Sequence, residues 1–240
     1  MTGISQEDLD SLRGIFSPLI GMKIDWLSIP EAALKGFDPG QIAIIINTLL
    51  EGILPQIELL ATDAANAEKL KLIGLSKAPG GVGEREGYPD YLHVSGRRVE
   101  LKGLFVDNPK LKLRRPPTPR EPSARLKENI TIDKIDPEND ILLVGAIQLK
   151  EERGRCCPFI IDIGLFSMWE CIRARDNRLL NGGGKWIGGI PVVISKKGRR
   201  KLKRGENLTE ADYEKDTNFG KLKRIPYPPL QAFLKKHKTL

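Results

Sequence analysis

Apolar and polar positions in the first third of the chain follow the spacing of helices. SQEDLDSLRGIF begins with Ser5, a residue type that caps helix N-termini, and acidic residues follow in its first turn. In DPGQIAIIINTLLEGIL, Asp38 precedes a proline and marks a second helix start, and Pro55 ends or kinks the run. QIELLATDAANAEKLKLIG predicts a further helix that stops near Gly74. Residues 1–76 are therefore expected to form a helical N-terminal part that serves packing or dimerisation.

Beyond a glycine-rich linker the pattern changes to that of strands. YLHV and RRVELKGLFV predict the two arms of a hairpin, and DILLVGAIQLK has the nearly continuous apolar centre of a strand buried on both faces. CPFIIDIGLF leads into the helical spacing of SMWECIRARDNRLL, and GGIPVVIS predicts a late buried strand. The order of these elements predicts an α/β or α+β fold, with a central mixed β-sheet flanked by helices. Residues 77–240 are expected to form the core, continuous with the N-terminal part.

The composition indicates a soluble globular protein, with 40% hydrophobic and 29% charged residues. The apolar run 42–54 is interrupted by Asn47 and Glu51, and we expect it to be too short and too broken to span a membrane. The acidic start MTGISQEDLD lacks a secretion signal, so we expect a cytoplasmic protein. No feature of the sequence is typical of a eukaryotic protein, so we expect a prokaryotic one. An odd number of cysteines without a repeated spacing indicates reduced thiols rather than disulfides or a zinc site: Cys156, Cys157 and Cys171.

The net charge of +8 is distributed unevenly. Residues 1–76 hold five basic and ten acidic residues, a net of −5, so the remaining 164 residues carry +13. Such asymmetry indicates a polyanionic partner for the second part of the chain.

Two segments concentrate the positive charge. KLKLRRPPTPREPSARLK combines basic residues with prolines, which is typical either of an arm that contacts phosphates or of a solvated loop. In KKGRRKLKRG seven of the nine residues 196–204 are basic, which we interpret as nucleic-acid contact rather than a nuclear localisation signal. The candidates for DNA contact in these segments and in the hairpin are Arg97, Arg98, Arg114, Arg115, Arg120, Arg125, Lys196, Lys197, Arg199, Arg200, Lys201, Lys203 and Arg204.

The hairpin GYPDYLHVSGRRVELKGLFVD carries three charges on an otherwise apolar strand pair. Because side chains alternate across a strand, Glu100 and Lys102 share one face. If SGR forms the turn around Gly96, Leu92 pairs with Glu100 and Asp90 lies opposite Lys102. All three charges then converge, whereas a two-residue turn would send Asp90 to the other face.

Two carboxylates held this close repel each other, and a divalent cation relieves the repulsion. Asp90, Glu100 and the main-chain carbonyl of Leu101 are oxygen ligands of the kind that Mg²⁺ prefers. Lys102 beside them is expected to stay cationic, to orient an attacking water and to stabilise charge on a phosphate. Of the 31 acidic residues, Glu100 alone has a lysine two positions later. The alternative is an exposed hairpin with an ordinary salt bridge.

At Pro89-Asp90 and Glu100-Leu101-Lys102 the chain resembles the PD-(D/E)xK nuclease superfamily, and among its members the type II restriction endonucleases. The resemblance implies Mg²⁺-dependent hydrolysis of phosphodiester bonds, with Asp90 and Glu100 as metal ligands and Lys102 in the catalytic shell. Many members add a glutamate from a preceding helix, for which Glu58 or Glu68 are the candidates.

The expected function is that of a sequence-specific endonuclease that cuts double-stranded DNA as a homodimer, because two symmetric sites suit a two-fold symmetric target. One alternative is a structure-selective repair or resolvase nuclease of the same superfamily. Another is a non-catalytic nucleic-acid-binding protein in which the charged hairpin is only a salt bridge.

Overall fold

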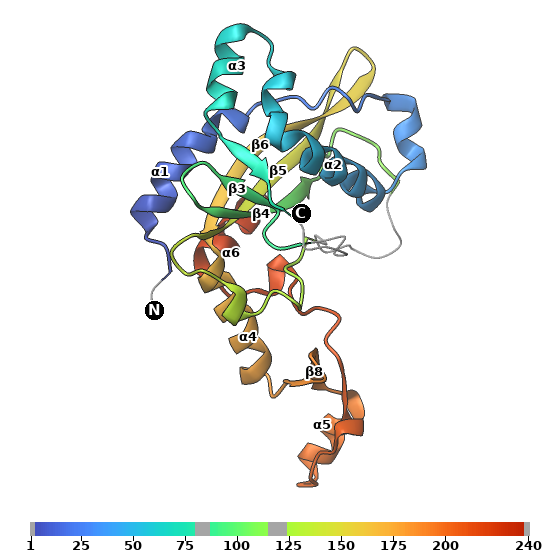
Figure 1. Cartoon of the computed structure of the whole chain (residues 1–240). Coiled ribbons are helices and arrows are strands. Elements are labelled where there is room, and N and C mark those ends of the chain that lie inside the picture. Colours follow the sequence, from blue (N-terminus) through green and yellow to red (C-terminus); the bar gives the residue numbers. More distant parts are fainter. Residues whose placement is uncertain (1–2, 80–86, 115–123, 238–240) are drawn as a thin grey trace.

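The computed structural model describes residues 3–79, 87–114 and 124–237. It confirms a mixed β-sheet flanked by helices (Figure 1). The strands of the large sheet are β1 (Ile29–Pro30), β2 (Leu75–Lys77), β3 (Tyr91–His93), β4 (Arg98–Val106), β5 (Asp140–Glu152) and β6 (Arg155–Ser167). Their spatial order is β1-β6-β5-β4-β3-β2, with β4 and β5 parallel and the other neighbours antiparallel.

Helices cover both faces of this sheet, and a second, small sheet lies beyond them. The α-helices are α1 (Gln6–Phe16), α2 (Pro39–Ile53), α3 (Ala64–Lys71), α4 (Met168–Asn181), α5 (Lys196–Lys203) and α6 (Pro228–Lys236). The 3₁₀ helices are η1 (Ser17–Leu19), η2 (Glu31–Gly36), η3 (Leu54–Leu60), η4 (Ile132–Lys134), η5 (Glu210–Asp212) and η6 (Leu222–Arg224). The small sheet has the order β7-β8-β9, from Lys185–Ile187, Ile190–Ile194 and Tyr213–Lys215.

The predicted caps start the predicted helices. The Ser5 hydroxyl accepts the Asp8 amide at the start of α1. The Asp38 carboxylate accepts two amides of α2, and the Gln41 side chain completes a capping box. The helix expected to continue to Gly74 is interrupted instead, because Gln56 is non-helical in η3 (φ −132°, ψ 37°) and α3 starts only at Ala64.

The apolar helical segment that contains α2 extends beyond the run 42–54, which was expected to be too short and too broken to span a membrane. Within Pro39–Leu60 an 18-residue window has a mean hydropathy of 1.5, so this segment is long and apolar enough to cross a membrane, although core helices meet the same criterion. α2 packs its inner side against the sheet through Ile42, Ile46, Leu50 and Ile53, all buried. The regular α-helix ends at Ile53, because Pro55 and the kink in η3 follow.

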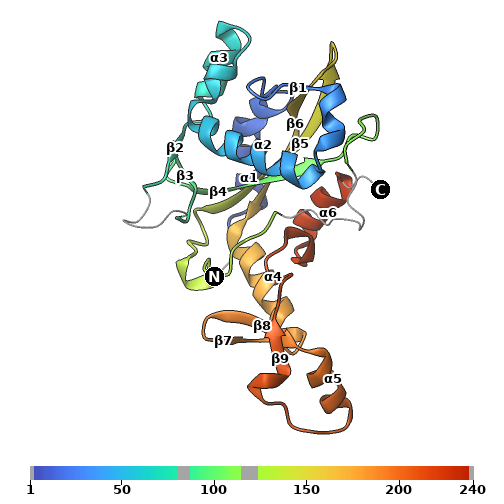
Figure 2. The same cartoon turned by 90° about the vertical axis from the view of Figure 1, so that its right-hand side faces the viewer.

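Strand β5 lies in the middle of the sheet and is buried on both faces, as its sequence predicts. Its odd-numbered residues, such as Ile141 and Leu143, face the core formed with α1 and α2. Its even-numbered residues, such as Leu142 and Val144, face the core formed with α4 and α6. The sheet therefore separates two apolar cores. Figure 2 shows α2 on one side of the sheet and α6 on the other.

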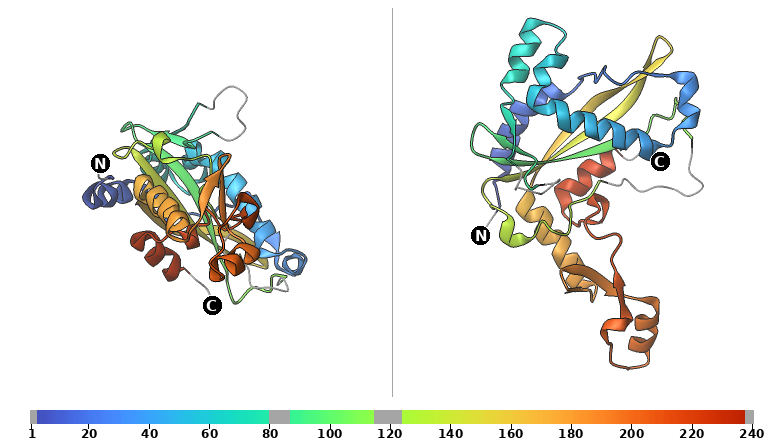
Figure 3. Two further views of the ribbon diagram at one scale, coloured as in Figure 1. Left: turned by 90° about the horizontal axis from the view of Figure 1, so that it is seen from below. Right: turned by 45° about the vertical axis from the view of Figure 1, so that its right-hand side comes forward.

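A small lobe projects from the far end of α4 and carries β7, β8, β9 and the basic helix α5 (Figures 1 and 3). An ion pair of 2.7 Å between Arg178 of α4 and Asp216 joins the lobe to the helix. The strand predicted at GGIPVVIS is thus confirmed as β8, but it lies in the lobe and is only partly buried. The expected division after residue 76 falls inside β2, so the helical N-terminal part and the sheet share one core.

Candidate active site

The two arms of the predicted hairpin are β3 and β4, in a register different from the expected one. Leu92 pairs with Arg98, not with Glu100, because VSG rather than SGR forms the turn. Continued by two residues, this register brings Asp90 level with Glu100 instead of Lys102. The shift of two residues preserves the alternation of faces, so the three charges still converge.

Asp90 directly precedes β3, at the point where β4 continues beyond its partner strand. Its Oδ2 accepts the Leu101 amide at 2.7 Å, so the carboxylate takes the place of a strand partner at this edge of β4. A main-chain hydrogen bond from Ala78 to the Asp90 carbonyl (3.1 Å) fixes the residue on its other side. The backbone of the sheet therefore holds the carboxylate in position.

The Lys102 ammonium collects the oxygens that were expected to bind a metal. Nζ lies 2.7 Å from Glu100 Oε1, 2.8 Å from the Leu101 carbonyl oxygen and 3.8 Å from Asp90 Oδ2. The second oxygen of Glu100, Oε2, is buried and has no hydrogen-bond partner among the described residues. The described residues contain no group of three His, Cys, Asp or Glu side chains arranged around one metal position. Three oxygens that surround an ammonium, with a fourth buried and unpaired, nevertheless fit a hard cation.

Burial and charge act in opposite directions on these groups. Burial is the main reason why the pKa of Glu100 is raised; the Lys102 ammonium opposes it and the Asp90 carboxylate adds to it. Burial alone would lower the pKa of Lys102, but the charges of Glu100 and Asp90 outweigh it and the pKa is raised. Lys102 is therefore a cation at neutral pH, which suits charge stabilisation and does not suit a neutral-amine base.

An acid that the sequence did not single out lies near the three charges. Glu51, an exposed residue of α2, contributes to the raised pKa of Lys102. The Tyr91 hydroxyl donates a 2.7 Å hydrogen bond to the Glu51 carbonyl, which ties this turn of α2 to β3. One turn earlier, a Cβ at Gly103 would lie 1.7 Å from Asn47 Oδ1, so the glycine lets α2 approach β4 closely. Asn47 and Glu51 interrupt the apolar run four residues apart, which is the signal that places both on one helix face.

The two glutamates expected from a preceding helix lie elsewhere. Glu68 pairs with Lys71 at 2.8 Å, and Glu58 adds to the raised pKa of the same lysine. Among the described residues, neither has an interaction with Asp90, Glu100 or Lys102. A helix acid at this site is therefore Glu51 rather than Glu58 or Glu68.

A second residue near the three charges, Lys127, was also not singled out; its segment is held by α4, on the face of the sheet away from α2. Lys127 lies close enough to Glu100 to act on its pKa. The fully buried Arg175 of α4 holds this segment in place by donating to the Lys127 carbonyl at 2.6 Å and to the Ile130 carbonyl at 2.8 Å. Lys127 was expected only as part of a basic segment, because nothing in its local sequence distinguishes it.

The candidate DNA contacts divide into engaged and exposed residues. Arg98 makes a two-pronged ion pair with the buried Asp140, and Arg97 donates to the Glu138 carbonyl at 2.8 Å. Both guanidinium groups are thus committed within the protein. Arg114 and Arg125 are exposed. Arg115 and Arg120 lie outside the described residues.

The basic run at 196–204 forms the helix α5 on the lobe. Its inner side is Gly198, where a Cβ would lie 2.4 Å from the Asp212 carbonyl oxygen. The other basic residues fall into two groups. Lys201 binds Asp212, Arg204 binds Glu206 and Arg199 binds the Ile194 carbonyl. In the described part of the chain no hydrogen bond or ion pair engages the exposed side chains of Lys196, Lys197, Arg200 and Lys203.

Comparison of the chain with protein-family models, with curated proteins and with solved structures finds no significant match.

Proposed function

We propose that this protein is a Mg²⁺-dependent, sequence-specific endonuclease of double-stranded DNA, of the type II restriction class, that acts as a homodimer. The observation that carries the proposal is the grouping of Asp90, Glu100 and the Leu101 carbonyl around the Lys102 ammonium, at a sheet edge. A structural salt bridge needs only one carboxylate and gains little from a desolvated second one.

The residues that would hold Mg²⁺ are Asp90, Glu100 and the Leu101 carbonyl. When bound there, the ion supplies a Lewis acid that activates water and neutralises the scissile phosphate. Asp90 is fixed by the Leu101 amide, so it needs no reorganisation to bind a cation. Lys102 remains protonated and stabilises the negative charge that develops on the phosphate, for which its raised pKa is suited.

The DNA partner is supported by charge rather than by the active site. The four unengaged cations of α5 repel one another, and the phosphates of a duplex relieve this repulsion. Lys127 adds a positive charge close to the carboxylates. A cation at the reaction centre and cations on a projecting lobe suit a long polyanion better than a small phosphate ester.

The test is incubation of the purified protein with long duplex DNA, in Mg²⁺ or in EDTA, beside the Lys102→Ala variant. We expect discrete fragments that require Mg²⁺, and a loss of cleavage in Lys102→Ala of at least about a hundredfold, since a preorganised charge-stabilising group contributes this much. DNA binding of the variant should persist, because phosphate affinity is spread over many basic residues. Lys69→Ala, an exposed lysine on α3, is the matched control.

Other outcomes separate the alternatives. Nicked circles, or cutting confined to branched DNA, would replace the restriction class by a repair or resolvase nuclease. Intact DNA that is shifted on a gel would leave a binding protein. A monomer in light scattering, with and without DNA, would remove the homodimer from the proposal.

A further inference from the structure

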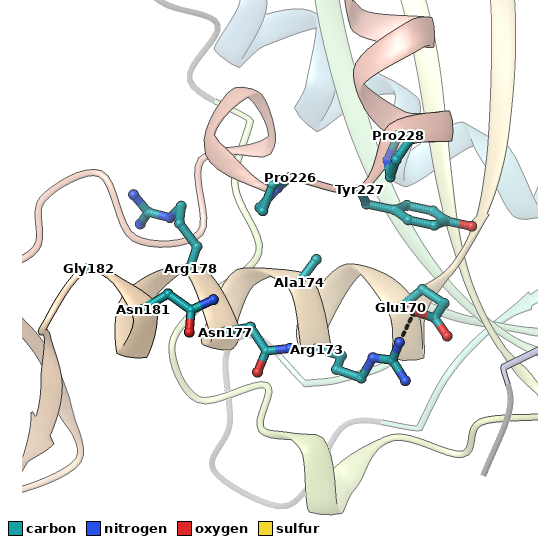
Figure 4. A pocket seen from close by; sticks show the side chains of 10 residues that line it. All are labelled: Glu170, Arg173, Ala174, Asn177, Arg178, Asn181, Gly182, Pro226, Tyr227 and Pro228. Atoms are coloured by element: carbon teal, nitrogen blue, oxygen red, sulfur yellow. Dashed lines mark ion pairs between the residues drawn. The ribbon is translucent and has the colours of Figure 1, made fainter.

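A groove with a volume of about 620 Å³ runs along α4. α4 forms its floor, and Pro226, Tyr227 and Pro228, where α6 begins, form the opposite wall (Figure 4). Arg173, Asn177 and Asn181 line the groove at intervals of four residues, so they share one side of the helix. None of them was among the residues expected to contact DNA.

The polar groups of this groove are largely uncommitted. Asn177 and Asn181 are exposed, and within the described ranges neither side chain has a hydrogen-bond partner. Arg173 has a single, exposed ion pair with Glu170 at 3.3 Å, which leaves most of its donors free. Asparagine is a poor helix former, and no cap or core contact explains Asn177 in the middle of α4. The row formed by Arg173, Asn177 and Asn181 is therefore better explained by a ligand than by a structural role.

Guanidinium and carboxamide groups are the side chains that pair in a bidentate manner with purine edges in the major groove of DNA. From Arg173 to Asn181 the helix rises by about 12 Å, and this length matches three or four base-pair steps of about 3.4 Å. The row thus has both the chemistry and the spacing to contact consecutive base pairs.

The groove starts close to the candidate active site. Tyr227, on its wall, packs edge-on against Phe166 of β6, with ring centroids 6.5 Å apart. Phe166 pairs with Leu142 of β5, and Leu142 pairs with Glu100 of β4. Two strand spacings, about 10 Å, therefore separate the backbones of Phe166 and Glu100. The lobe that carries α5 joins the other end of α4 (Figure 2).

We infer that the groove along α4 receives the major-groove edge of the duplex, and that Arg173, Asn177 and Asn181 determine the sequence preference. The inference rests on the proposed function for the identity of the partner. The duplex would extend from the carboxylates along α4 to the lobe, where α5 contacts phosphates. Glu170 orients the Arg173 guanidinium by their ion pair.

The experiment uses a library of duplexes with a randomised central segment and the full-length protein. Cleaved ends are sequenced after reaction in Mg²⁺, and bound duplexes are sequenced after selection in EDTA. The variants are Asn177→Ala and Arg173→Lys, which keeps the charge but loses the planar fork. The control is Asn66→Ala on α3, at the opposite end of the molecule (Figure 1).

We expect the wild type and Asn66→Ala to select one consensus. Asn177→Ala and Arg173→Lys should each lose discrimination at one or two positions of it by about tenfold to a hundredfold. Their thermal stability should stay unchanged.

The possible results distinguish this inference from the nuclease proposal. Discrete cleavage with the same consensus in both variants would overturn the inference that the groove determines sequence preference, and would leave the nuclease proposal standing. Selective binding without cleavage, lost in the variants, would overturn the nuclease and support the groove. Cleavage or binding without any consensus, or no interaction with duplex DNA, would overturn the groove as the element that determines sequence preference.

Discussion

At Lys102, an ammonium and a divalent ion require the same oxygens. Its Nζ contacts Glu100 Oε1 and the Leu101 carbonyl oxygen and lies 3.8 Å from Asp90 Oδ2. The lysine side chain must therefore withdraw before a metal ion can take this position. Until then its charge compensates that of the Glu100 carboxylate and opposes the rise in the pKa of Glu100 that burial causes.

This competition predicts that Lys102→Met binds Mn²⁺ more tightly than the wild type, by about tenfold or more, because the charge that repels the ion is gone. Titration followed by the electron paramagnetic resonance of free Mn²⁺ measures this affinity without any cleavage. The variant should also be less stable in EDTA and regain stability in Mn²⁺, since the buried Glu100 and the partly buried Asp90 no longer have this cationic partner. Lys69→Met serves as the control, and an unchanged or weaker affinity in Lys102→Met would show that the lysine does not obstruct the metal position.

The convergence of the three charges could be predicted from the sequence, because it depends on the alternation of the strands and on a turn of three residues. Strand alternation alone leaves the register open, since two turns of equal length preserve the same faces. Gly96 decides between them: it has φ +84°, and a three-residue turn needs its left-handed residue in the last place, not in the middle. Glu51 was missed for a different reason, because its approach to Lys102 depends on the close packing of α2 over Gly103.

Among the elements, α1 and α6 are fastened to the sheet by one carboxylate. Asp162 of β6 is buried and accepts from Arg13 at 3.2 Å, from Lys236 at 2.6 Å and from His237 at 2.9 Å. Burial raises its pKa, but the hydrogen bonds from Lys236 and His237 outweigh it and the pKa is lowered. The ionised form is therefore the one that binds both helices.

Asp162→Asn should lower the free energy of unfolding at pH 7 by about 1–2 kcal/mol, at the low end for a buried charged group because its partners Arg13 and Lys236 are exposed. A lowered carboxyl pKa stabilises the fold above the unfolded value of about 3.9, and this contribution is lost as the pH falls through the folded-state pKa. The difference in the free energy of unfolding between wild type and variant should therefore shrink in acid. Urea unfolding at pH 7 and at pH 3 tests this, with the exposed Asp25→Asn as control. A difference that stays constant with pH would contradict the role of the ionised carboxylate.

Most elements could be predicted from local signals such as the caps Ser5 and Asp38 and the apolar run of β5. The helix α5 could not, because seven like charges in nine residues disfavour a helix in isolation. Its helical state depends on tertiary contacts: Ser195 caps it, Gly198 packs against the Asp212 carbonyl and Lys201 binds the Asp212 carboxylate.

For the whole molecule, the asymmetry of charge has a spatial form. The net negative residues 1–76 include the helices α1 to α3, whereas the unengaged cations gather on the lobe at the opposite end (Figure 3). Neither the lobe nor its attachment by Arg178 and Asp216 could be predicted from the sequence. The lobe depends on the pairing of β8 with β9, two strands that the basic helix α5 separates along the chain.

This distribution predicts a large effect of α5 on the salt dependence of DNA binding. Replacement of its four unengaged cations by glutamine should reduce the slope of log K against log salt by about 0.9 for each phosphate that the helix no longer neutralises, up to about 3–4 in total. Lys35→Gln with Lys69→Gln, two exposed lysines of the N-terminal part, should leave the slope unchanged. Fluorescence anisotropy between about 50 and 200 mM salt covers the range. Equal slopes for the two sets of variants would remove α5 from the interface.

Because β6 leads directly into α4, the length of α4 determines where the lobe lies relative to the large sheet. Strand β6 ends at Ser167 and α4 begins at Met168, so no flexible joint separates the large sheet from the helix that carries the lobe. Each residue added to or removed from such a helix turns everything beyond it by about 100° and moves it by about 1.5 Å. The length of α4 thus fixes both the orientation of the lobe and its distance from the sheet. One residue inserted in α4 would turn α5 away from its present direction without altering a single charge.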